Sequence, residues 1–207
     1  MSASLTALAA ANARRWEAMH LRAGLVPQFD TTAHRLCAAD AKARYAMIAR
    51  ATGVPWWVIA VIHEREAGGP PHFDRSIAQG DPLCEVSRHE PSGRGPFLDY
   101  ASDPPGQDAF YRGALDALIE CPPRAASWKD WSVGGTLCLL EQYNGLGYAA
   151  MGRPSPYVWS GSDQYVSGKY IRDHVYDPHA VDAQEGCAPL VARMMAIDAS
   201  IAFAAAL

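Results

Sequence analysis

The sequence predicts a mainly helical protein of the α+β class, with a small β region in its middle. Three observations support this fold class. Helical periodicity with short connections fills most of the first 67 residues. Gly, Pro, Asp and Ser then become frequent between residues 68 and 107, where the helical period is lost. Helical patterns return from residue 109 onward.

Two helices are expected before residue 54. The first covers residues 4–23, with a loose apolar stripe and a glycine after it: Leu5, Leu8, Ala9, Trp16, Met19 and Gly24. The second is expected to start at the capping residues 30–32 and to continue to Thr52, where Gly53 ends it. Short connections therefore join the successive helices.

A third helix, expected over residues 55–67, is the stretch around which the chain is organised. Pro55 suits the first turn of a helix because its φ is fixed and it has no N–H, and Gly68 and Gly69 end the helix. Residues 56–62 are all apolar, so we expect this helix to be buried on every side. Its last turn changes character and carries His63, Glu64, Arg65 and Glu66.

Glu66 is the candidate general acid in that last turn. Ile59, Ile62, His63 and Glu66 share one helical stripe, which places the carboxyl on a largely apolar surface. Partial desolvation raises the pKa of a carboxyl and keeps it protonated near neutral pH, as a general acid requires. The plain alternative is a solvated helix end with local ion pairs. A zinc site of the H-E-x-x-H type is not formed, because residue 67 is Ala67.

The remaining segments are expected to alternate between irregular structure and helix. Residues 73–79 and 84–87 are candidate strands on either side of the turn Gly80-Asp81-Pro82, and residues 89–107 are a long loop suited to the wall of a cleft. An aromatic and polar loop is expected over residues 154–170. The later helices are expected at residues 109–121, 132–143 and 189–206.

Length and composition narrow the functional classes. A chain of 207 residues is expected to form a single domain over residues 1–207, with residues 1–29 as an N-terminal helical extension. The formal net charge is −4 and no basic run occurs, so nucleic acid is not an expected partner. The five cysteines lack metal-ligand spacing, so no metal and no cofactor are expected.

The same composition bears on localisation. The Ala-rich start lacks the basic region of a secretory signal, and no apolar run reaches the ~20 residues of a membrane span. We therefore expect a soluble monomer that is made in the cytoplasm and does not insert stably into a membrane.

Aromatic and amide side chains form the candidate sugar-binding set. Flat aromatic faces stack on pyranose rings and amides bind hydroxyl groups. Packing of the loops onto the core is the alternative role for these aromatic side chains. The candidates are His63, Gln79, Tyr143, Asn144, Tyr148, Tyr157, Trp159 and Tyr165.

Five stretches resemble motifs of a family of phage and bacterial lysozyme-like proteins. Residues 62–67 resemble the I-H-x-R-E-S stretch of that family, and residues 80–83 resemble its G-D-P-L. Residues 141–148 resemble E-x-Y-N-G-x-G-Y, and residues 155–160 with 168–170 resemble S-P-Y-x-W-S followed by G-K-Y. The matches keep their order and cover roughly residues 45–195. More distantly, Glu66 and residues 143–145 are similar to motifs of goose-type lysozymes and soluble lytic transglycosylases.

This resemblance implies a two-lobed lysozyme fold with a small β-hairpin region flanking a cleft. It also implies cleavage of the β-1,4 bond between N-acetylmuramic acid and N-acetylglucosamine in peptidoglycan. Glu66 matches the glutamate of the family's E-S pair, whereas Ala67 departs from its serine, which puts a supporting hydrogen bond in doubt.

The second catalytic group is left open by the sequence. Glycosidases usually pair the acid with a second carboxylate, for which Asp74 and Asp81 are the candidates. Hydrolysis is favoured on that ground. If neither carboxylate takes part, Glu66 would act alone, as in lytic transglycosylases, and give 1,6-anhydromuramic products.

Two other classes of function remain as alternatives. One is a glycan-binding protein on a lysozyme scaffold without activity, since a fold does not guarantee chemistry. The other is a chitinase-like hydrolase. The biological role expected from the resemblance is an endolysin that a holin-type pore releases to act on the cell wall in the periplasm. An effector exported by a secretion machine is the alternative.

Overall fold

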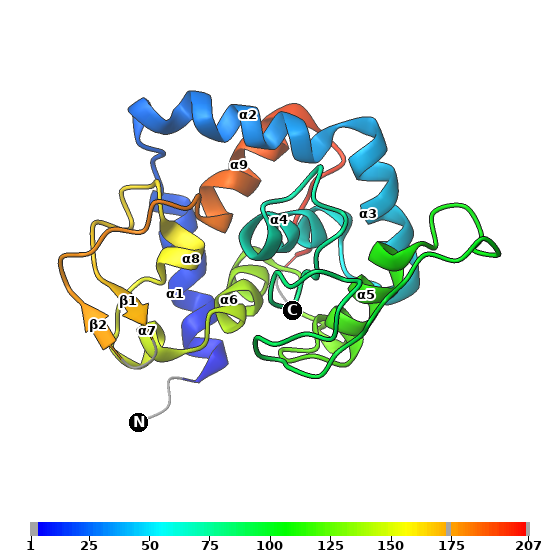
Figure 1. The fold of residues 1–207 in the computed structure, drawn as a ribbon. Coiled ribbons are helices and arrows are strands. Elements are labelled where there is room, and N and C mark those ends of the chain that lie inside the picture. Colours follow the sequence, from blue (N-terminus) through cyan, green and yellow to red (C-terminus); the bar gives the residue numbers. More distant parts are fainter. Residues whose placement is uncertain (1–3, 173–174, 206–207) are drawn as a thin grey trace. The chain divides into compact units, whose positions relative to one another are not determined.

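The computed structural model describes residues 4–172 and 175–205. About half of the chain is helical, and the described residues contain a single two-stranded antiparallel sheet (Figure 1). The prediction of a mainly helical fold with a small β-hairpin is therefore confirmed.

The chain divides into two compact units. One unit comprises residues 1–34 and 130–207, and the other comprises residues 35–129. We call them the terminal unit and the central unit. The first 34 residues cluster with the last third of the chain, so the N-terminal helix is part of the terminal unit.

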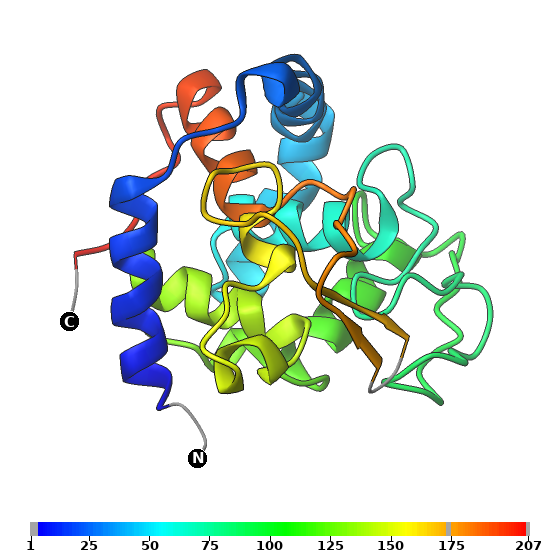
Figure 2. The same cartoon turned by 90° about the vertical axis from the view of Figure 1, so that its left-hand side faces the viewer.

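The terminal unit consists of helices and a short hairpin at its edge (Figure 1). In chain order its elements are α1 (Leu5–Ala18), η1 (Ala23–Leu25), most of α2 (Val26–Cys37), α6 (Val133–Tyr143), α7 (Gly147–Ala150), α8 (Pro156–Trp159), β1 (Lys169–Arg172), β2 (Val175–Asp177) and α9 (Cys187–Ile197). Tyr170 pairs with Tyr176 across the two antiparallel strands. Helix α8 packs against both α6 and α9, which enclose it (Figure 2).

Close packing of α1 on α6 organises this unit, and both figures show the two helices side by side. Ser4 caps α1 by accepting a hydrogen bond from the Ala7 N–H at 3.1 Å. A Cβ added to Gly134 would lie 2.3 Å from the carbonyl oxygen of Ala9. The absence of a side chain at Gly134 therefore permits the two helix backbones to approach.

The central unit is built around the buried helix α4. Its elements are α3 (Ala39–Thr52), α4 (Trp56–Ala67), α5 (Ala109–Ile119) and η2 (Ala125–Ser127). Residues 57–63 of α4 are all buried, as the unbroken apolar run predicts. Tyr45 and Ile48 of α3 and Phe110 and Leu118 of α5 are buried in the same unit.

Several helix boundaries were predicted wrongly. The first helix, expected over residues 4–23, ends at Ala18, and a separate 3-10 turn covers Ala23–Leu25. The helix expected from residues 30–32 to Thr52 is two helices, α2 and α3, which are separated at Ala38. Helix α2 begins at Val26, so the expected capping residues lie inside it. Pro27 is accommodated in its first turn, where a missing N–H costs no hydrogen bond.

The position of the β structure was also predicted wrongly. Residues 73–87 contain a single antiparallel bridge, between Arg75 and Pro82, in place of the expected strand pair. The two paired strands are instead residues 169–172 and 175–177, the first of which begins within the expected loop. A proline in the return segment removes an N–H that a longer ladder would need.

The last helix ends earlier than expected, at Ile197. Asp198 Oδ1 accepts hydrogen bonds from the backbone N–H of Ser200 at 2.9 Å and from its hydroxyl at 2.7 Å. Such local bonds compete with the helix. The expected final residue, Ala206, lies outside the described residues. Helices α5 and α6 begin at Ala109 and Val133, within one residue of their expected starts, and the side chains of Asp108 and Ser132 cap them.

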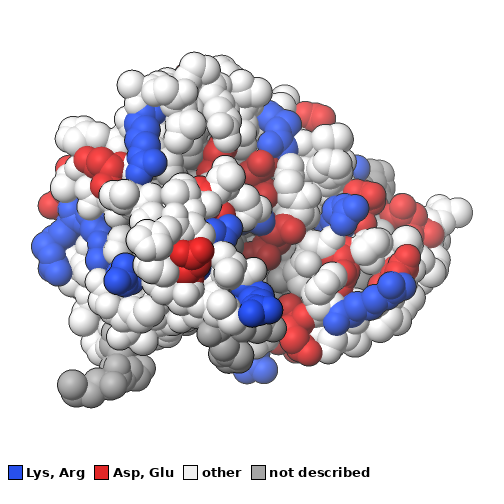
Figure 3. Space-filling model, turned by 60° about the vertical axis from the view of Figure 1, so that its left-hand side comes forward, with Lys and Arg blue, Asp and Glu red and all other residues white. Residues whose placement is uncertain are grey.

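The charged side chains on the surface bear on binding to nucleic acid, and the lengths of the helices bear on insertion into a membrane. On the face drawn in Figure 3, Lys and Arg side chains are interspersed with Asp and Glu side chains. No single helix among the described residues combines the length and apolarity needed to cross a membrane. Helices α3 and α4 meet those criteria only as a pair, with a bend of 113° between them.

Replacing Gly134 by alanine tests the α1–α6 contact. The new methyl group would press on the Ala9 carbonyl, so we expect the free energy of unfolding to fall by about 1–3 kcal/mol. Urea denaturation monitored by circular dichroism measures this change. Gly24→Ala is the matched control, because nothing lies within 4 Å of its added Cβ. Equal stability of the two variants would contradict the close approach of α1 and α6.

Candidate functional site

His63 is a structural residue of the central unit. Its side chain is fully buried, with Nδ1 2.8 Å from the Tyr45 hydroxyl and Nε2 3.0 Å from the carbonyl oxygen of His72. Because a carbonyl only accepts, Nε2 carries the proton and Nδ1 accepts from Tyr45. Burial lowers the pKa of His63 to about 4, so its ring is neutral at pH 7. His63 therefore fixes the chain after α4 and has no face left for a sugar.

The structure separates the two glutamates at the end of α4. The Glu64 carboxylate forms a bidentate ion pair with Arg35, at 2.9 and 2.8 Å to the same guanidinium nitrogen. The Glu64 side chain is only 16% exposed. Glu64 is therefore held by Arg35. Glu66 lies two residues later, and its exposure is intermediate, as that of Glu64 is.

Arg35 also holds the chain that leaves α4. Its guanidinium donates hydrogen bonds to the carbonyl oxygens of Gly68 and Pro70. A Cβ added to Gly69 would lie 2.2 Å from a Glu64 carboxylate oxygen and 2.9 Å from Arg35 Nη1, so only glycine fits there. We call the arrangement of Arg35, Glu64 and residues 68–70 the Arg35 clamp. It fixes the end of the helix that carries Glu66.

The turn at Gly80 lies directly against the residue proposed as the acid. Gly80 has a φ of +74°, and an added Cβ would lie 2.5 Å from the carbonyl oxygen of Glu66. Glycine is therefore required both by conformation and by space. Two of the stretches that resemble the lysozyme-like motifs, residues 62–67 and 80–83, are thus in contact within the central unit.

Asp81 has a structural role in this turn. Its Oδ2 accepts hydrogen bonds from the backbone N–H groups of Arg88 at 2.8 Å and His89 at 2.9 Å, and its Oδ1 lies 2.7 Å from His89 Nδ1. Burial raises the pKa of the Asp81 carboxyl, but the hydrogen bonds from His89 and Arg88 outweigh burial and lower it. Asp81 therefore stays ionised and anchors the loop that follows.

The other two predicted residues of this region differ in their bonding. Gln79 is engaged within the loop, since its Oε1 accepts from the Ser76 hydroxyl at 2.6 Å and its Nε2 donates to the Pro91 carbonyl at 3.2 Å. Asp74 is exposed, and no described residue bonds its carboxylate. Asp74 is thus the candidate second carboxylate that remains available for chemistry.

In the terminal unit, three tyrosines form an edge-to-face cluster. The ring centroids of Tyr148, Tyr170 and Tyr176 lie 5.3 to 6.3 Å apart. The Tyr148 hydroxyl accepts a hydrogen bond from the Tyr170 N–H at 2.9 Å, and Gly147 leaves room for the Tyr170 ring. The stretches 141–148 and 168–170 therefore meet, and Tyr148 anchors the hairpin.

Burial decides the role of most predicted sugar-binding aromatics. The side chains of Tyr148, Tyr157, Trp159 and Tyr165 are each at most 4% exposed. They have no accessible face for a pyranose ring, so their role in this structure is packing. Tyr143 is half-buried and Asn144 is exposed, which leaves these two as the accessible members of the set.

Glu141 is a carboxyl whose pKa is changed by burial. It is completely buried on α6, where its Oε2 accepts from Asn12 Nδ2 of α1 at 3.1 Å. Burial raises its pKa. A group with no exposed surface cannot reach a glycosidic oxygen, so Glu141 joins two helices and does not compete with Glu66 as the acid.

Sequence reasoning missed Arg35, Tyr45 and Glu141. Glu141 stands in a recognised motif and on an apolar stripe, so its position carried a usable signal. Arg35 lies 29 residues before Glu64, and no local pattern links the two. The described residues contain no group of three or more His, Cys, Asp or Glu side chains that could hold a metal ion.

Comparisons of the chain with protein-family models, with curated proteins and with solved structures found no match. The resemblance to lysozyme-like motifs is therefore a hypothesis that depends on the residues themselves. Their geometry, with two pairs of motif stretches in contact, is the observation that bears on it.

The Arg35 clamp predicts a large stability effect. Arg35→Gln leaves the mostly buried Glu64 without a cation and frees two carbonyl groups, so we expect a loss of about 2–4 kcal/mol in the free energy of unfolding. Amide hydrogen exchange at residues 66–69 should accelerate as well. Arg88→Gln is the control, because its pair with Glu85 is 81% and 50% exposed and should contribute about 0.5 kcal/mol. Equal effects of both substitutions would refute the clamp.

Burial of neutral His63 predicts that acid weakens the fold. The unfolded-state pKa of 6.5 exceeds the folded-state value of about 4, so the unfolded chain binds the proton more tightly. The free energy of unfolding therefore includes a contribution of about 3 kcal/mol from keeping His63 neutral. This contribution is fully present above pH 6.5 and is lost as the pH falls toward 4. Urea denaturation over this range, with His63→Gln showing a shallower dependence, measures it. An imidazole NMR signal of His63 that titrates near 6.5 in the folded protein would contradict the burial.

Proposed function

We propose that this protein is a peptidoglycan glycosidase in which Glu66 is the general acid. The observation that supports this role most strongly is the position of Glu66 at the end of the buried helix α4. Arg35 neutralises Glu64, while Glu66 is half-buried beside the Gly80 turn. A half-buried carboxyl at the exit of an apolar helix can hold a proton and still meet a substrate.

The proposed reaction is cleavage of the β-1,4 bond between N-acetylmuramic acid and N-acetylglucosamine. Glu66 would protonate the glycosidic oxygen as the bond to the muramic acid carbon breaks. In the hydrolytic route a second carboxylate activates the attacking water. Asp74 is the candidate, because the Asp81 carboxylate already accepts three hydrogen bonds. The chain would then act as a muramidase.

A lytic transglycosylase is the second candidate function. The bonding of Asp81 favours it, since that carboxylate is committed to the loop and one of the two expected partners of Glu66 is thereby removed. Glu66 would then protonate the leaving group and afterwards accept the proton of the muramyl 6-hydroxyl as that hydroxyl attacks. The product would be a 1,6-anhydromuramic end.

Cell lysis is the proposed biological setting. An endolysin that reaches the periplasm through a holin-type pore fits the proposed reaction, as does an effector exported to a competing cell. A glycan-binding protein without activity is the alternative that the experiment below would reveal. All three share peptidoglycan strands as the partner.

Glu66→Gln tests the proposed acid. The amide cannot donate the required proton, so we expect the rate of reducing-end release from purified Gram-negative peptidoglycan to fall by about 100-fold or more. Glu64→Gln keeps an acceptor for Arg35 and should lose less than tenfold. Thermal unfolding of each variant confirms that it is folded. An active Glu66→Gln protein together with an inactive Glu64→Gln protein would show that Glu64 is the acid.

A further inference from the structure

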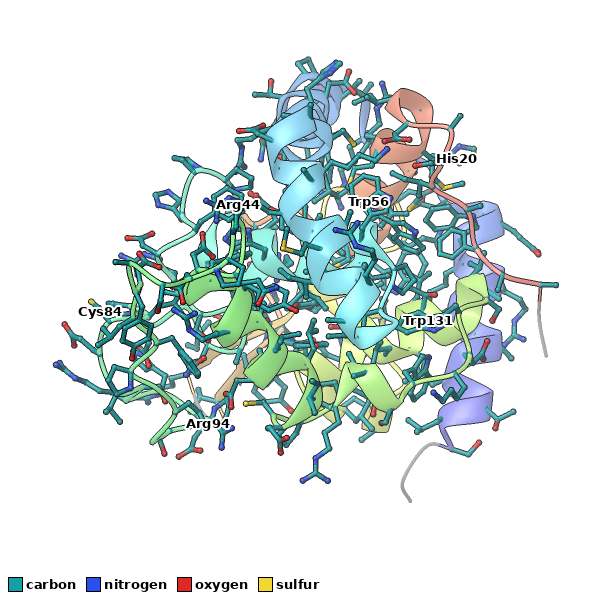
Figure 4. The ribbon with its side chains drawn as sticks, turned by 90° about the vertical axis from the view of Figure 1, so that its right-hand side faces the viewer. His20, Arg44, Trp56, Cys84, Arg94 and Trp131 are labelled. Carbon is teal, nitrogen blue, oxygen red and sulfur yellow. The ribbon has the colours of Figure 1, made fainter. Side chains whose placement is uncertain are left out.

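The central unit contains a cavity of about 730 Å³ that the proposed acid does not occupy. It lies between Arg44 of α3, the first residues of α5, and segments of the loops at residues 71–74, 82–84 and 97–99. A volume of this size suits a small ligand or one sugar unit. Figure 4 shows Arg44 extending from α3 toward the loops, whose outer edge carries Cys84.

Charges in the cavity are predominantly negative. Asp74, Asp99 and Asp108 line it together with a single cation, Arg44. Arg44 is already paired with Asp108 at 2.6 Å, and Asp99 Oδ1 accepts from the Ala109 N–H at 2.7 Å. The Asp74 carboxylate thus pairs with no cation among the described residues, whereas Asp99 lies close enough to Arg112 outside the cavity wall to help raise the pKa of that guanidinium. The cavity is complementary to a positive charge.

The walls supply an apolar surface beside these carboxylates. Phe73, Phe97 and Phe110 line the cavity, and the Arg44 guanidinium lies over the Phe73 ring, 4.6 Å from its centroid. Arg44 therefore shows, within the protein itself, that a cation is held here by a ring on one side and a carboxylate on the other. A ligand with a positive group and an apolar face could likewise contact an aromatic ring and a carboxylate, here that of Asp74 or Asp99.

We propose that this cavity binds a hexosamine that carries a free 2-ammonium group, that is, a glucosamine unit without its N-acetyl group. The apolar face of a pyranose ring suits the phenylalanine walls, and the ammonium suits the carboxylates. An N-acetylated sugar lacks the charge. A stem peptide of peptidoglycan carries more carboxylates than ammonium groups, so the three aspartates would repel its net negative charge.

The choice of a cell-wall sugar depends on the proposed function, whereas the cavity and its charge do not. Under that function the protein would favour glycan strands in which glucosamine has been deacetylated near the bond to be cleaved. Residues 82 and 83 of the cavity directly follow the turn that contacts Glu66. Binding at the cavity and cleavage at Glu66 are measured separately, so either proposal can fail alone.

Cys84 provides a probe of the cavity. It is an exposed free thiol in the cavity wall, whereas Cys121, Cys138 and Cys187 are buried and Cys37 is partly buried. A ligand in the cavity should shield Cys84 from iodoacetamide. Peptide mass spectrometry distinguishes its alkylation from that of Cys37.

The experiment compares the glucosamine tetramer with the N-acetylglucosamine tetramer, at a pH at which the amines are protonated. We expect the glucosamine tetramer to bind in calorimetry and to slow Cys84 alkylation at least threefold, with Cys37 unaffected. Asp99→Asn removes one charge and keeps the acceptor for Ala109, so it should weaken binding about two- to fivefold. Asp40→Asn, an exposed carboxylate of α3 that does not line the cavity, is the control.

Three outcomes would overturn the inference. They are equal affinity for the two tetramers, binding without protection of Cys84, and equal weakening by Asp99→Asn and Asp40→Asn. Selective binding by a protein that cleaves no peptidoglycan would support the cavity and refute the proposed function. Cleavage of peptidoglycan without selective binding would support the proposed function and refute the proposal for the cavity.

Discussion

The ion pair between Arg35 and Glu64 is the interaction on which the arrangement of the central unit depends. Helix α4 is buried along most of its length, so its last turn is where the chain must return to solvent. Arg35 neutralises the first glutamate of that turn and binds the carbonyls of the residues that leave it. Gly69 makes this approach possible because a side chain would collide with both partners. These contacts fix the end of α4, and with it the backbone position of Glu66.

Two pairs of the stretches that resemble lysozyme-like motifs are in contact, one pair in each unit. In the central unit the Gly80 turn lies against the Glu66 carbonyl, and in the terminal unit Tyr148 binds the backbone of Tyr170. Each pair joins stretches that are distant in sequence and that were recognised separately. Several motif residues are therefore explained by packing alone: Tyr148, Tyr157, Trp159 and Tyr165 are buried, and Asp81 anchors a loop. Under the proposed function, Glu66 and Asp74 are the two carboxylates assigned to chemistry.

Local signals predicted the helices, and distant contacts account for what was missed. Ser132 and Asp108 mark helix starts through side-chain caps, and Gly53 marks an end through its positive φ. The break at Ala38 has no such signal. The hairpin at residues 169–177 depends on Tyr148, more than 20 residues earlier, and the Arg35 clamp spans 29 residues. Glu66 was selected from the apolar periodicity of its own helix, which is a local pattern. The burial of the aromatic candidates depends on packing throughout the terminal unit, which no local pattern reveals.

The most direct test of Glu66 as the acid of a glycosidase is the mass of the muropeptides released from purified peptidoglycan by the wild-type protein and by Glu66→Gln. Hydrolysis predicts products that end in reducing muramic acid and that disappear in the variant. Products that end in 1,6-anhydromuramic acid and that also depend on Glu66 would support Glu66 as the general acid. They would show that the muramyl 6-hydroxyl, and not water, attacks the broken bond. Folded wild-type protein that releases no muropeptide, or releases as much after substitution of Glu66, would contradict the account.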